Sequence, residues 1–265
     1  PNADASFDTL MEKTALFFLG SPYVAHTLEV SDEELLVINL REFDCVTFIE
    51  TVIALANTIP SGKNGFDDYA AQLQRVRYRN GDLNGYASRL HYTSEWAQQQ
   101  RRHGENPGPA RHPGGALPGA TGPGVMHEGV KGQINFMSTH RESYKQLKTN
   151  DNLWQEIKEI EGAINDRGGF YFLPKNQIAS VATNIPHMAM IGFTTSIKGL
   201  DTTHTGFAFQ QDGRLTFIHA SSLKDQVVID DKTLHDYCAG QSSCNGIIVV
   251  KVQSCVKNTD PLAFP

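Results

Sequence analysis

The chain has 265 residues, of which 40% are hydrophobic and 20% are charged, so it is long enough and apolar enough to bury a core. Its formal net charge of −6 excludes a broadly basic surface of the kind that binds nucleic acid or an anionic membrane. No apolar run approaches the ~20 residues that a membrane-spanning helix needs. We therefore expect neither a nucleic-acid partner nor a membrane span.

The N-terminal part of the chain carries helical patterns. Apolar residues at helical spacing predict helices over residues 7–18, 45–57, 66–76 and 86–100. Ser31, followed by Glu34 at the third helical position, predicts a further short helix. Residues 101–130 hold eight Gly and five Pro without an aromatic residue, so we expect a flexible loop there. The three His of this stretch match no metal-ligand spacing, and we expect no metal site.

The C-terminal part turns from helices to strands. Helical patterns cover residues 138–166, 178–182 and 234–239, and strand patterns cover 187–193, 203–210, 214–220, 226–229 and 246–252. Helices first and an antiparallel set of strands afterwards are typical of the α+β class. No clean boundary divides the chain, so we expect one domain over residues 1–265, with helical additions to its core.

Cys45 directly follows Asp44 at the start of a helical apolar pattern. Asp44 is suited to cap this helix by accepting hydrogen bonds from the N–H groups of the first turn. The positive end of the helix dipole would then stabilise a thiolate and lower the pKa of the Cys45 thiol. The same N–H groups could hold an oxyanion. The alternative is that Cys45 is a small buried side chain on a core helix.

A predicted hairpin supplies two histidines. Asp212-Gly213 between alternating strands indicates a two-residue hairpin loop. In the register that this loop sets, Gly206 faces His219, and His204 is the diagonal neighbour of His219 on the same face. Cys45 as nucleophile, His204 as base and His219 as orienting group would together make a catalytic triad. Each His taken alone is more commonly an exposed or hydrogen-bonded residue without such a role.

The four cysteines contain no CxxC pair, and none forms a cluster with zinc-ligand spacing. Cys238 and Cys244 are close enough in sequence to close a small disulfide loop in an oxidising compartment. The spacing alone leaves that disulfide open, and Cys45 would stay free.

Three segments resemble motifs of one superfamily. Phe43-Asp44-Cys45 resembles the Asp-Cys nucleophile motif of the NlpC/P60 cysteine peptidases, and Leu19-Gly20-Ser21-Pro22-Tyr23 resembles the Gly-x-Pro-Tyr segment that precedes it. The stretch from His204 to Ser221 resembles their second motif. Leu40-Arg41-Glu42-Phe43-Asp44-Cys45, with Leu90-His91-Tyr92 downstream, is closer still to the DUF1460 branch, whose members look like N-acetylmuramoyl-L-alanine amidases. The resemblance covers most of the chain apart from residues 101–130.

The resemblance implies a papain-like α+β fold in which the nucleophile helix packs on an antiparallel sheet. It also implies hydrolysis through a thioester, without a cofactor. By motif position, Cys45 is the nucleophile, His204 is the base and His219 is the third polar residue.

Three further residues are candidate substrate contacts. Tyr23 is a candidate near the oxyanion or the substrate, with a core tyrosine as the alternative. Asp44 would contact substrate or only cap its helix. Arg41 is suited to pair with a substrate carboxylate, and its alternative is a surface ion pair with Glu42.

On this interpretation the chain is a bacterial amidase, periplasmic or secreted, that cuts between the lactyl group of N-acetylmuramic acid and L-alanine in muropeptides. We expect it to be a monomer. An endopeptidase acting within the stem peptide, an acyltransferase using the same thioester and a non-catalytic cell-wall-binding domain remain as alternatives. The joint presence of Cys45, His204 and His219 argues against the non-catalytic alternative.

Overall fold

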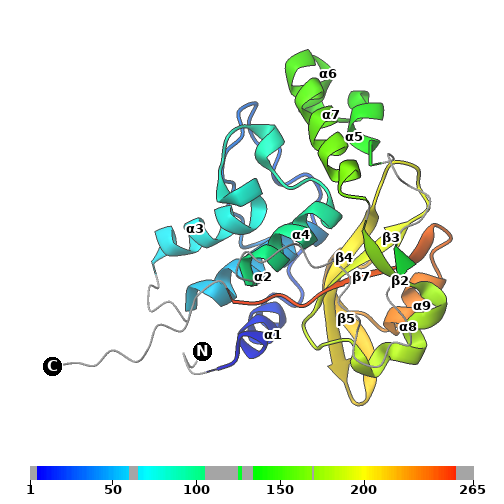
Figure 1. The fold of residues 1–265 in the computed structure, drawn as a ribbon. Coiled ribbons are helices and arrows are strands. Elements are labelled where there is room, and N and C mark those ends of the chain that lie inside the picture. The colour runs from blue at the N-terminus through cyan, green and yellow to red at the C-terminus, as the bar shows by residue number, and fades with distance from the viewer. Residues whose placement is uncertain (1–4, 60–64, 105–124, 127–133, 169, 255–265) are drawn as a thin grey trace.

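The computed structural model describes residues 5–59, 65–104, 125–126, 134–168 and 170–254 (Figure 1). Its centre is a seven-stranded sheet in the order β1-β2-β7-β3-β4-β5-β6. Every pair of neighbouring strands in this sheet runs antiparallel. The described chain therefore combines helices with an antiparallel sheet, which confirms the predicted α+β class.

Helices dominate the first part of the chain and strands the last, although β1 and β2 lie among the helices and α9 lies between β6 and β7. The helices are α1 (Phe7–Phe17), α2 (Cys45–Thr58), α3 (Phe66–Arg77), α4 (Thr93–Gly104), α5 (Phe136–Thr139), α6 (Lys145–Lys148), α7 (Asp151–Asp166), α8 (Lys175–Ile178) and α9 (Leu234–Ala239). The strands are β1 (Val125–Met126), β2 (Tyr171–Pro174), β3 (Met190–Thr195), β4 (Thr202–Gln211), β5 (Arg214–Ser221), β6 (Gln226–Ile229) and β7 (Cys244–Val250). Short 3-10 turns cover Arg79–Gly81, Tyr86–Ser88, Arg141–Ser143 and Ala179–Asn184.

Helices cover both faces of the central strands (Figure 1). On one face α2 packs against β4 and β5, and the rings of Phe48 and Phe207 lie 6.0 Å apart between centroids. On the other face α8 and α9 bring Ile178 and Leu234 into a second core cluster with Phe217. Successive residues of β4 and β5 alternate between these two cores. The two-sided burial explains why both strands are rich in apolar residues.

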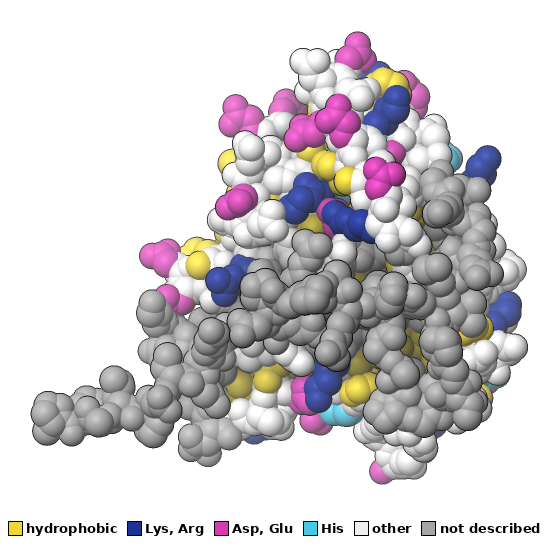
Figure 2. Space-filling view, viewed as in Figure 1, with side chains coloured by type: hydrophobic (Ala, Val, Ile, Leu, Met, Phe, Trp, Pro, Cys, Tyr) yellow, Lys and Arg dark blue, Asp and Glu magenta, His cyan; other side chains and the backbone are white. Residues whose placement is uncertain are grey.

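Helices α5 to α7 extend together from one end of the sheet (Figure 1). Asp and Glu side chains gather over this end in the space-filling view (Figure 2). On α7 the exposed carboxylates include those of Asp151, Glu156 and Glu159. This end of the described chain therefore presents negative charge to the solvent.

The β4–β5 hairpin has the register that the sequence predicts. Asp212 and Gly213 form its loop with φ angles of 51° and 75°. Positive φ at both loop residues is the signature of a type I′ turn, which Asp-Gly favours. Gln211 pairs with Arg214 across the loop, as expected.

Most other predicted elements are present, with shifts at their ends. The helices predicted over 7–18, 45–57, 66–76 and 234–239 correspond to α1, α2, α3 and α9, and the strand predicted over 226–229 is β6. The strands predicted over 187–193 and 246–252 are displaced to β3 and β7. Met188 lies in the left-handed region at φ 59°, so the backbone cannot continue as a strand there and β3 begins after it. The short strands β1 and β2 were not predicted.

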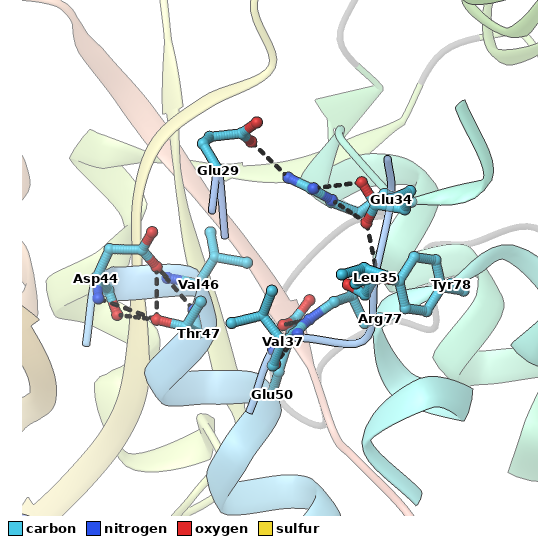
Figure 3. A network of polar contacts seen from close by, with 11 residues as sticks. Glu29, Glu34, Leu35, Val37, Asp44, Val46, Thr47, Glu50, Arg77 and Tyr78 are labelled. Carbon is cyan, nitrogen blue, oxygen red and sulfur yellow. Dashed lines mark hydrogen bonds and ion pairs between the residues drawn. The ribbon is translucent and has the colours of Figure 1, made fainter. Parts of the chain in front are cut away.

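The predicted short helix at Ser31 is wrong. Residues 31–38 contain no helix, and Ser31 only accepts a hydrogen bond from the N–H of Glu33 at 3.3 Å. The Glu34 carboxylate instead accepts hydrogen bonds from Arg89, at 2.6 and 2.9 Å, and from the Tyr78 hydroxyl at 2.7 Å (Figure 3). These tertiary contacts hold the segment in an irregular path, because they occupy the side chain that would have closed the capping box.

A second buried ion pair joins α2 to α3, and its arginine also contacts the irregular segment 31–38. Arg77 lies 2.6 Å from the Glu50 carboxylate, and both side chains are 2% exposed. Arg77 also donates to the carbonyl of Val37 at 2.6 Å (Figure 3). The irregular segment that leads to Cys45 is thus bound to the helical layer by buried charges rather than by helix hydrogen bonds.

Two predicted long helices are broken. Residues 86–88 form a 3-10 turn, and Arg89 pairs with Tyr78 in an isolated bridge, so the helix predicted over 86–100 begins only at α4. The helix predicted over 138–166 is divided into α5, α6 and α7. Asn150 interrupts it by capping α7, since its side chain accepts from the N–H of Leu153 at 3.0 Å.

Two parts of the predicted loop over residues 101–130 are regular structure. Residues 101–104 are the last turn of α4, so the loop boundary predicted at 101 is wrong, and residues 125–126 form β1. The rest of this stretch lies outside the described residues.

Cys238 and Cys244 form a disulfide with a Cα–Cα distance of 5.5 Å, which decides the pairing that the sequence left open. Cys45 is the free cysteine of the described chain, as expected, whereas Cys255 lies outside it.

Among the helices that the structure describes, none combines the length and the apolar composition that crossing a bilayer requires.

Candidate active site

Cys45 occupies the first position of α2, directly after its cap. The Asp44 carboxylate accepts hydrogen bonds from the N–H groups of Val46 at 3.0 Å and Thr47 at 2.8 Å (Figure 3). The N–H of Asp44 donates to the Thr47 hydroxyl at 2.9 Å, which completes a capping box. The predicted cap is confirmed. Because Asp44 occupies the N–H groups of Val46 and Thr47, an oxyanion at Cys45 would have to use other donors.

The backbone around Cys45 is tied to two other parts of the chain. The Thr205 hydroxyl on β4 donates to the carbonyl of Cys45 at 2.9 Å, and Thr205 is the neighbour of His204. Tyr23 pairs with Phe43 in an isolated parallel bridge. Segments that are distant in sequence, around residues 23, 45 and 205, therefore meet at the start of α2.

The electrostatic environment of Cys45 opposes ionisation of its thiol. Burial raises the pKa of Cys45 to about 11, and the adjacent Asp44 carboxylate adds to the increase, whereas hydrogen bonds from Thr205 lower it. The expectation of a lowered thiol pKa is therefore wrong. The helix dipole acts here against desolvation and a neighbouring negative charge, and the thiol is neutral at pH 7.

Tyr23 lies in the same environment. Burial raises the pKa of Tyr23, and the negative charges of Cys45 and Asp44 contribute in the same direction. The phenol is therefore protonated at neutral pH and can donate a hydrogen bond. Of the predicted substrate contacts, Tyr23 and Asp44 thus lie beside Cys45.

His204, His219 and Asp230 form a continuous set of hydrogen bonds, which we call the histidine array. Nε2 of His204 lies 2.6 Å from Nδ1 of His219, and Nε2 of His219 lies 3.2 Å from Oδ2 of Asp230. The His219 side chain is 1% exposed and that of Asp230 is 12% exposed. Gly206 makes this packing feasible, since a Cβ placed on it would lie 3.1 Å from Cβ of His219.

The pKa values of His204 and Asp230 differ from those of free side chains. Burial, together with the neighbouring His219, lowers the pKa of His204 to about 3, so His204 is neutral at pH 7. Burial acts to raise the pKa of Asp230, but hydrogen bonds from His219 and from the N–H of Lys232 outweigh it, and the net pKa lies below the ordinary value. A neutral imidazole is the form that accepts a proton.

An aromatic wall encloses the two histidines. The ring of Tyr237, on α9, lies 6.0 Å from that of His204 and 5.9 Å from that of His219 between centroids. Phe193 stacks on His204 at 6.0 Å, and Phe217 stacks on His219 at 4.2 Å. Burial raises the pKa of Tyr237 to about 12, with Asp230 and Cys45 adding to it. The aromatic rings thus pack against both imidazoles, and a neutral phenol lies beside them.

Arg41 is not brought into this group. Its side chain is exposed, and within the described chain it makes no ion pair with Glu42. The Glu42 carboxylate instead accepts a hydrogen bond from Asn39 at 3.2 Å. The surface ion pair considered for Arg41 is therefore wrong, and a contact between Arg41 and substrate stays a prediction.

The site combines a helix-capped cysteine with two histidines that share a hydrogen bond. A model of the AmiA-like family, described as N-acetylmuramoyl-L-alanine amidase-like, matches residues 13–247, which contain Cys45 and the histidine array. This chain belongs to the AmiA-like family. No curated protein matches it.

Solved structures share the fold of this AmiA-like protein over most of its length. An N-acetylmuramoyl-L-alanine amidase from Bacteroides uniformis has 31% identity and a TM-score of 0.75, covering 93% of this chain and 99% of that one. A Bacteroides fragilis protein provisionally named a xylanase has 34% identity and a TM-score of 0.76, covering 89% and 98%. A Legionella pneumophila protein of the DUF1460 family has 18% identity and a TM-score of 0.61, covering 94% and 91%, and shows a similar fold only.

The sequence did not predict three residues of this candidate site, namely Thr205, Asp230 and Tyr237. A signal for Asp230 was present, because it is a carboxylate directly after the strand Gln226–Ile229, which pairs with the strand of His219. Thr205 and Tyr237 carried no such signal. Tyr237 reaches the array through the packing of α9 on β5 and β7, which no local pattern encodes.

Proposed function

We propose that this AmiA-like protein is a cysteine-dependent hydrolase that cleaves the amide bond between N-acetylmuramic acid and L-alanine in muropeptides, through a thioester on Cys45. The observation that carries the proposal is the Thr205–Cys45 hydrogen bond, which joins the start of the Cys45 helix to the strand position beside His204. We further propose that the catalytic domain has the papain-like fold of the NlpC/P60 superfamily. A nucleophile helix packed on an antiparallel sheet supports this assignment.

In the proposed reaction, Sγ of Cys45 attacks the lactyl carbonyl carbon while its proton passes to His204. Both groups are neutral at rest, because the thiol pKa is raised and the imidazole pKa is lowered. Proton transfer must therefore accompany attack, as in general-base catalysis, instead of preceding it as a stored ion pair.

The tetrahedral oxyanion requires donors that the capping box has not already used. The N–H of Cys45 and the hydroxyl of Tyr23 are the candidates, since Asp44 occupies the next two N–H groups. When the oxyanion collapses, the carbon–nitrogen bond breaks and His204 returns its proton to the amine of L-alanine. Water then attacks the thioester, His204 accepts the proton of that water, and the muramic acid carboxylate leaves as the thiol is restored.

The cell wall as substrate also suggests where the protein acts. We propose a periplasmic or secreted location, which the Cys238–Cys244 disulfide supports because structural disulfides persist in oxidising compartments. Muropeptides would be the binding partner.

Two competing activities make different products. An endopeptidase would release shortened peptides and leave alanine on the sugar, and an acyltransferase would pass the muramoyl group to another amine. The xylanase name of the Bacteroides fragilis protein would require glycoside cleavage, which uses a pair of carboxyl groups at the scissile bond. Here the Asp44 carboxylate caps α2 and that of Asp230 binds His219, so both are engaged elsewhere.

The test is mass spectrometry of defined muropeptides after incubation with the wild-type protein and with Cys45→Ala. We expect free N-acetylmuramic acid and a peptide that begins with L-alanine, from the wild type only. Sugar–alanine fragments with shortened peptides would replace the amidase with the endopeptidase, and reducing sugar released from xylan would point to a glycosidase.

A further inference from the structure

Asp230 lies where its carboxylate can act on both histidines. It is the first residue after β6, and its N–H donates to the carbonyl of Phe217 at 2.9 Å. Its Oδ1 accepts the N–H of Lys232 at 2.8 Å, which turns Oδ2 toward His219. The Thr216 hydroxyl donates to the Asp230 carbonyl at 2.6 Å. The carboxylate is thus held by its own turn and by the strand that carries His219.

We propose that Asp230 is a positioning residue that sets the direction of the hydrogen bonds in the histidine array, so that Nδ1 of His204 is left free to take the proton of Cys45. This inference rests on the proposed function, because it assumes that His204 is the base.

The direction of the hydrogen bonds in the histidine array follows from which of its atoms can donate and which can accept. An ionised carboxylate can only accept, so Nε2 of His219 must carry the proton that it shares with Asp230. When His219 carries this one proton only, its Nδ1 is bare and must accept from Nε2–H of His204 over their 2.6 Å contact. A neutral His204 with its proton on Nε2 has its lone pair on Nδ1. One carboxylate therefore determines the tautomers of both rings.

The charge of Asp230 also favours the transition state. When His204 takes a proton, the positive charge forms next to His219, in a site lined by the rings of Phe193 and Phe217. The Asp230 carboxylate acts on His204 in the direction that favours this protonated form, against burial and the neighbouring His219. The other titratable groups in the field of the array are Lys232, Tyr237 and Cys45. None of these three contacts His219 by a described hydrogen bond, so within the described chain the ring of His219 is held by Asp230 on one nitrogen and by His204 on the other.

A purely structural role for Asp230 is the competing explanation, since its turn also depends on it. Asp230→Asn distinguishes the structural role from the positioning role. Asparagine keeps the shape of the side chain and an acceptor oxygen for the N–H of Lys232. Its side-chain NH2 would then face Nε2 of His219 as a donor. The array would reverse, and Nδ1 of His204 would carry a proton. Replacing an orienting aspartate by asparagine is known to disable a catalytic triad in this way.

The experiment compares Asp230→Asn with Asp231→Asn, in the wild-type and the His219→Gln backgrounds. Asp231 is a matched control, because its side chain is 87% exposed and pairs only with Lys224 among the described residues. We measure kcat and KM on the muropeptide, the rate at which iodoacetamide alkylates Cys45, and the ring-nitrogen shifts of ¹⁵N-labelled histidines. The last two measurements need no substrate.

We expect Asp230→Asn to lower kcat by ~10²–10⁴-fold with KM unchanged, to slow alkylation at pH 7 and to move the His204 ring to its Nδ1–H tautomer. Asp231→Asn should match the wild type. In the His219→Gln background, the further loss from Asp230→Asn should disappear, because Asp230 acts through His219.

Three outcomes would overturn the inference: unchanged tautomers in Asp230→Asn, an equal loss in both backgrounds, or an equal loss in Asp231→Asn. Failure of the proposed function would give a different result from failure of the inference about Asp230. In that case no muropeptide is cleaved by any variant, while the tautomers and the alkylation rate still respond to Asp230→Asn.

Discussion

Nε2 of His204 and Nδ1 of His219 lie 2.6 Å apart, so the two imidazoles share one hydrogen bond in a partly buried site. A neutral imidazole has one donor and one acceptor nitrogen, and each ring therefore fixes the tautomer of the other. This relationship makes the two residues unequal. His204 keeps a nitrogen for the reaction, whereas both nitrogens of His219 are engaged, with His204 and Asp230.

Cys45→Ala is expected to abolish turnover, with a loss of ~10⁴-fold or more, because no other group can form the thioester. The thermal unfolding midpoint should change little, since the Cys45 carbonyl that binds Thr205 remains. Muropeptide turnover and circular dichroism provide the two measurements. A variant that turns over at the wild-type rate would remove Cys45 from the mechanism.

His204→Ala is expected to cost more activity than His219→Gln. Loss of the base removes proton transfer, which contributes ~10²–10⁴-fold, whereas glutamine can still offer His204 a polar partner. Steady-state kinetics of the two variants measure the difference. Small and equal losses would contradict the proposed triad.

Alkylation of Cys45 by iodoacetamide is expected to accelerate steadily with pH. Because burial raises its pKa to about 11, the thiolate fraction should rise roughly tenfold per pH unit between pH 7 and 10. A peptide-resolved mass-spectrometric assay follows this residue, and Cys255→Ser provides a variant with no other thiol. A plateau reached below pH 7 would instead reveal a stored thiolate–imidazolium pair.

The free energy of unfolding is expected to fall as the pH drops from 6.5 toward 3. Burial lowers the pKa of His204 and of His91 to about 3, from the ordinary 6.5. Between these values the unfolded chain binds protons that the folded chain does not, so acid favours unfolding. Above pH 6.5 both states are neutral and this contribution vanishes. Urea unfolding at a series of pH values measures the slope, which His91→Asn should reduce.

Arg77→Ala is expected to destabilise the fold by ~3–5 kcal/mol, because it leaves the buried Glu50 carboxylate unpaired. Lys145→Ala is the matched control, since its ion pair with Asp32 is exposed and should contribute nothing measurable. Chemical denaturation compares the two variants. Equal effects would mean that the buried Arg77–Glu50 pair contributes no more stability than the exposed Lys145–Asp32 pair.

Local sequence patterns predicted a large part of this fold. Asp44 before an apolar helix, and Asp212-Gly213 between two strands, act through hydrogen bonds and φ angles of adjacent residues, so α2 and the β4–β5 hairpin were predictable. The hairpin register alone places His204 and His219 on one face. The Cys238–Cys244 pair was within reach of the spacing, although the spacing did not decide it.

Only the tertiary structure decided the rest, because it depends on partners that are distant in sequence. Glu34 forms buried contacts with Arg89 and Tyr78 in place of the predicted helix at Ser31. The pKa of Cys45 depends on burial, which reverses the effect expected from the helix dipole alone. Asp230 reaches His219 only because β6 pairs with β5. Sequence patterns thus determine residue types and local geometry, whereas desolvation and long-range hydrogen bonds determine the chemical state of the site.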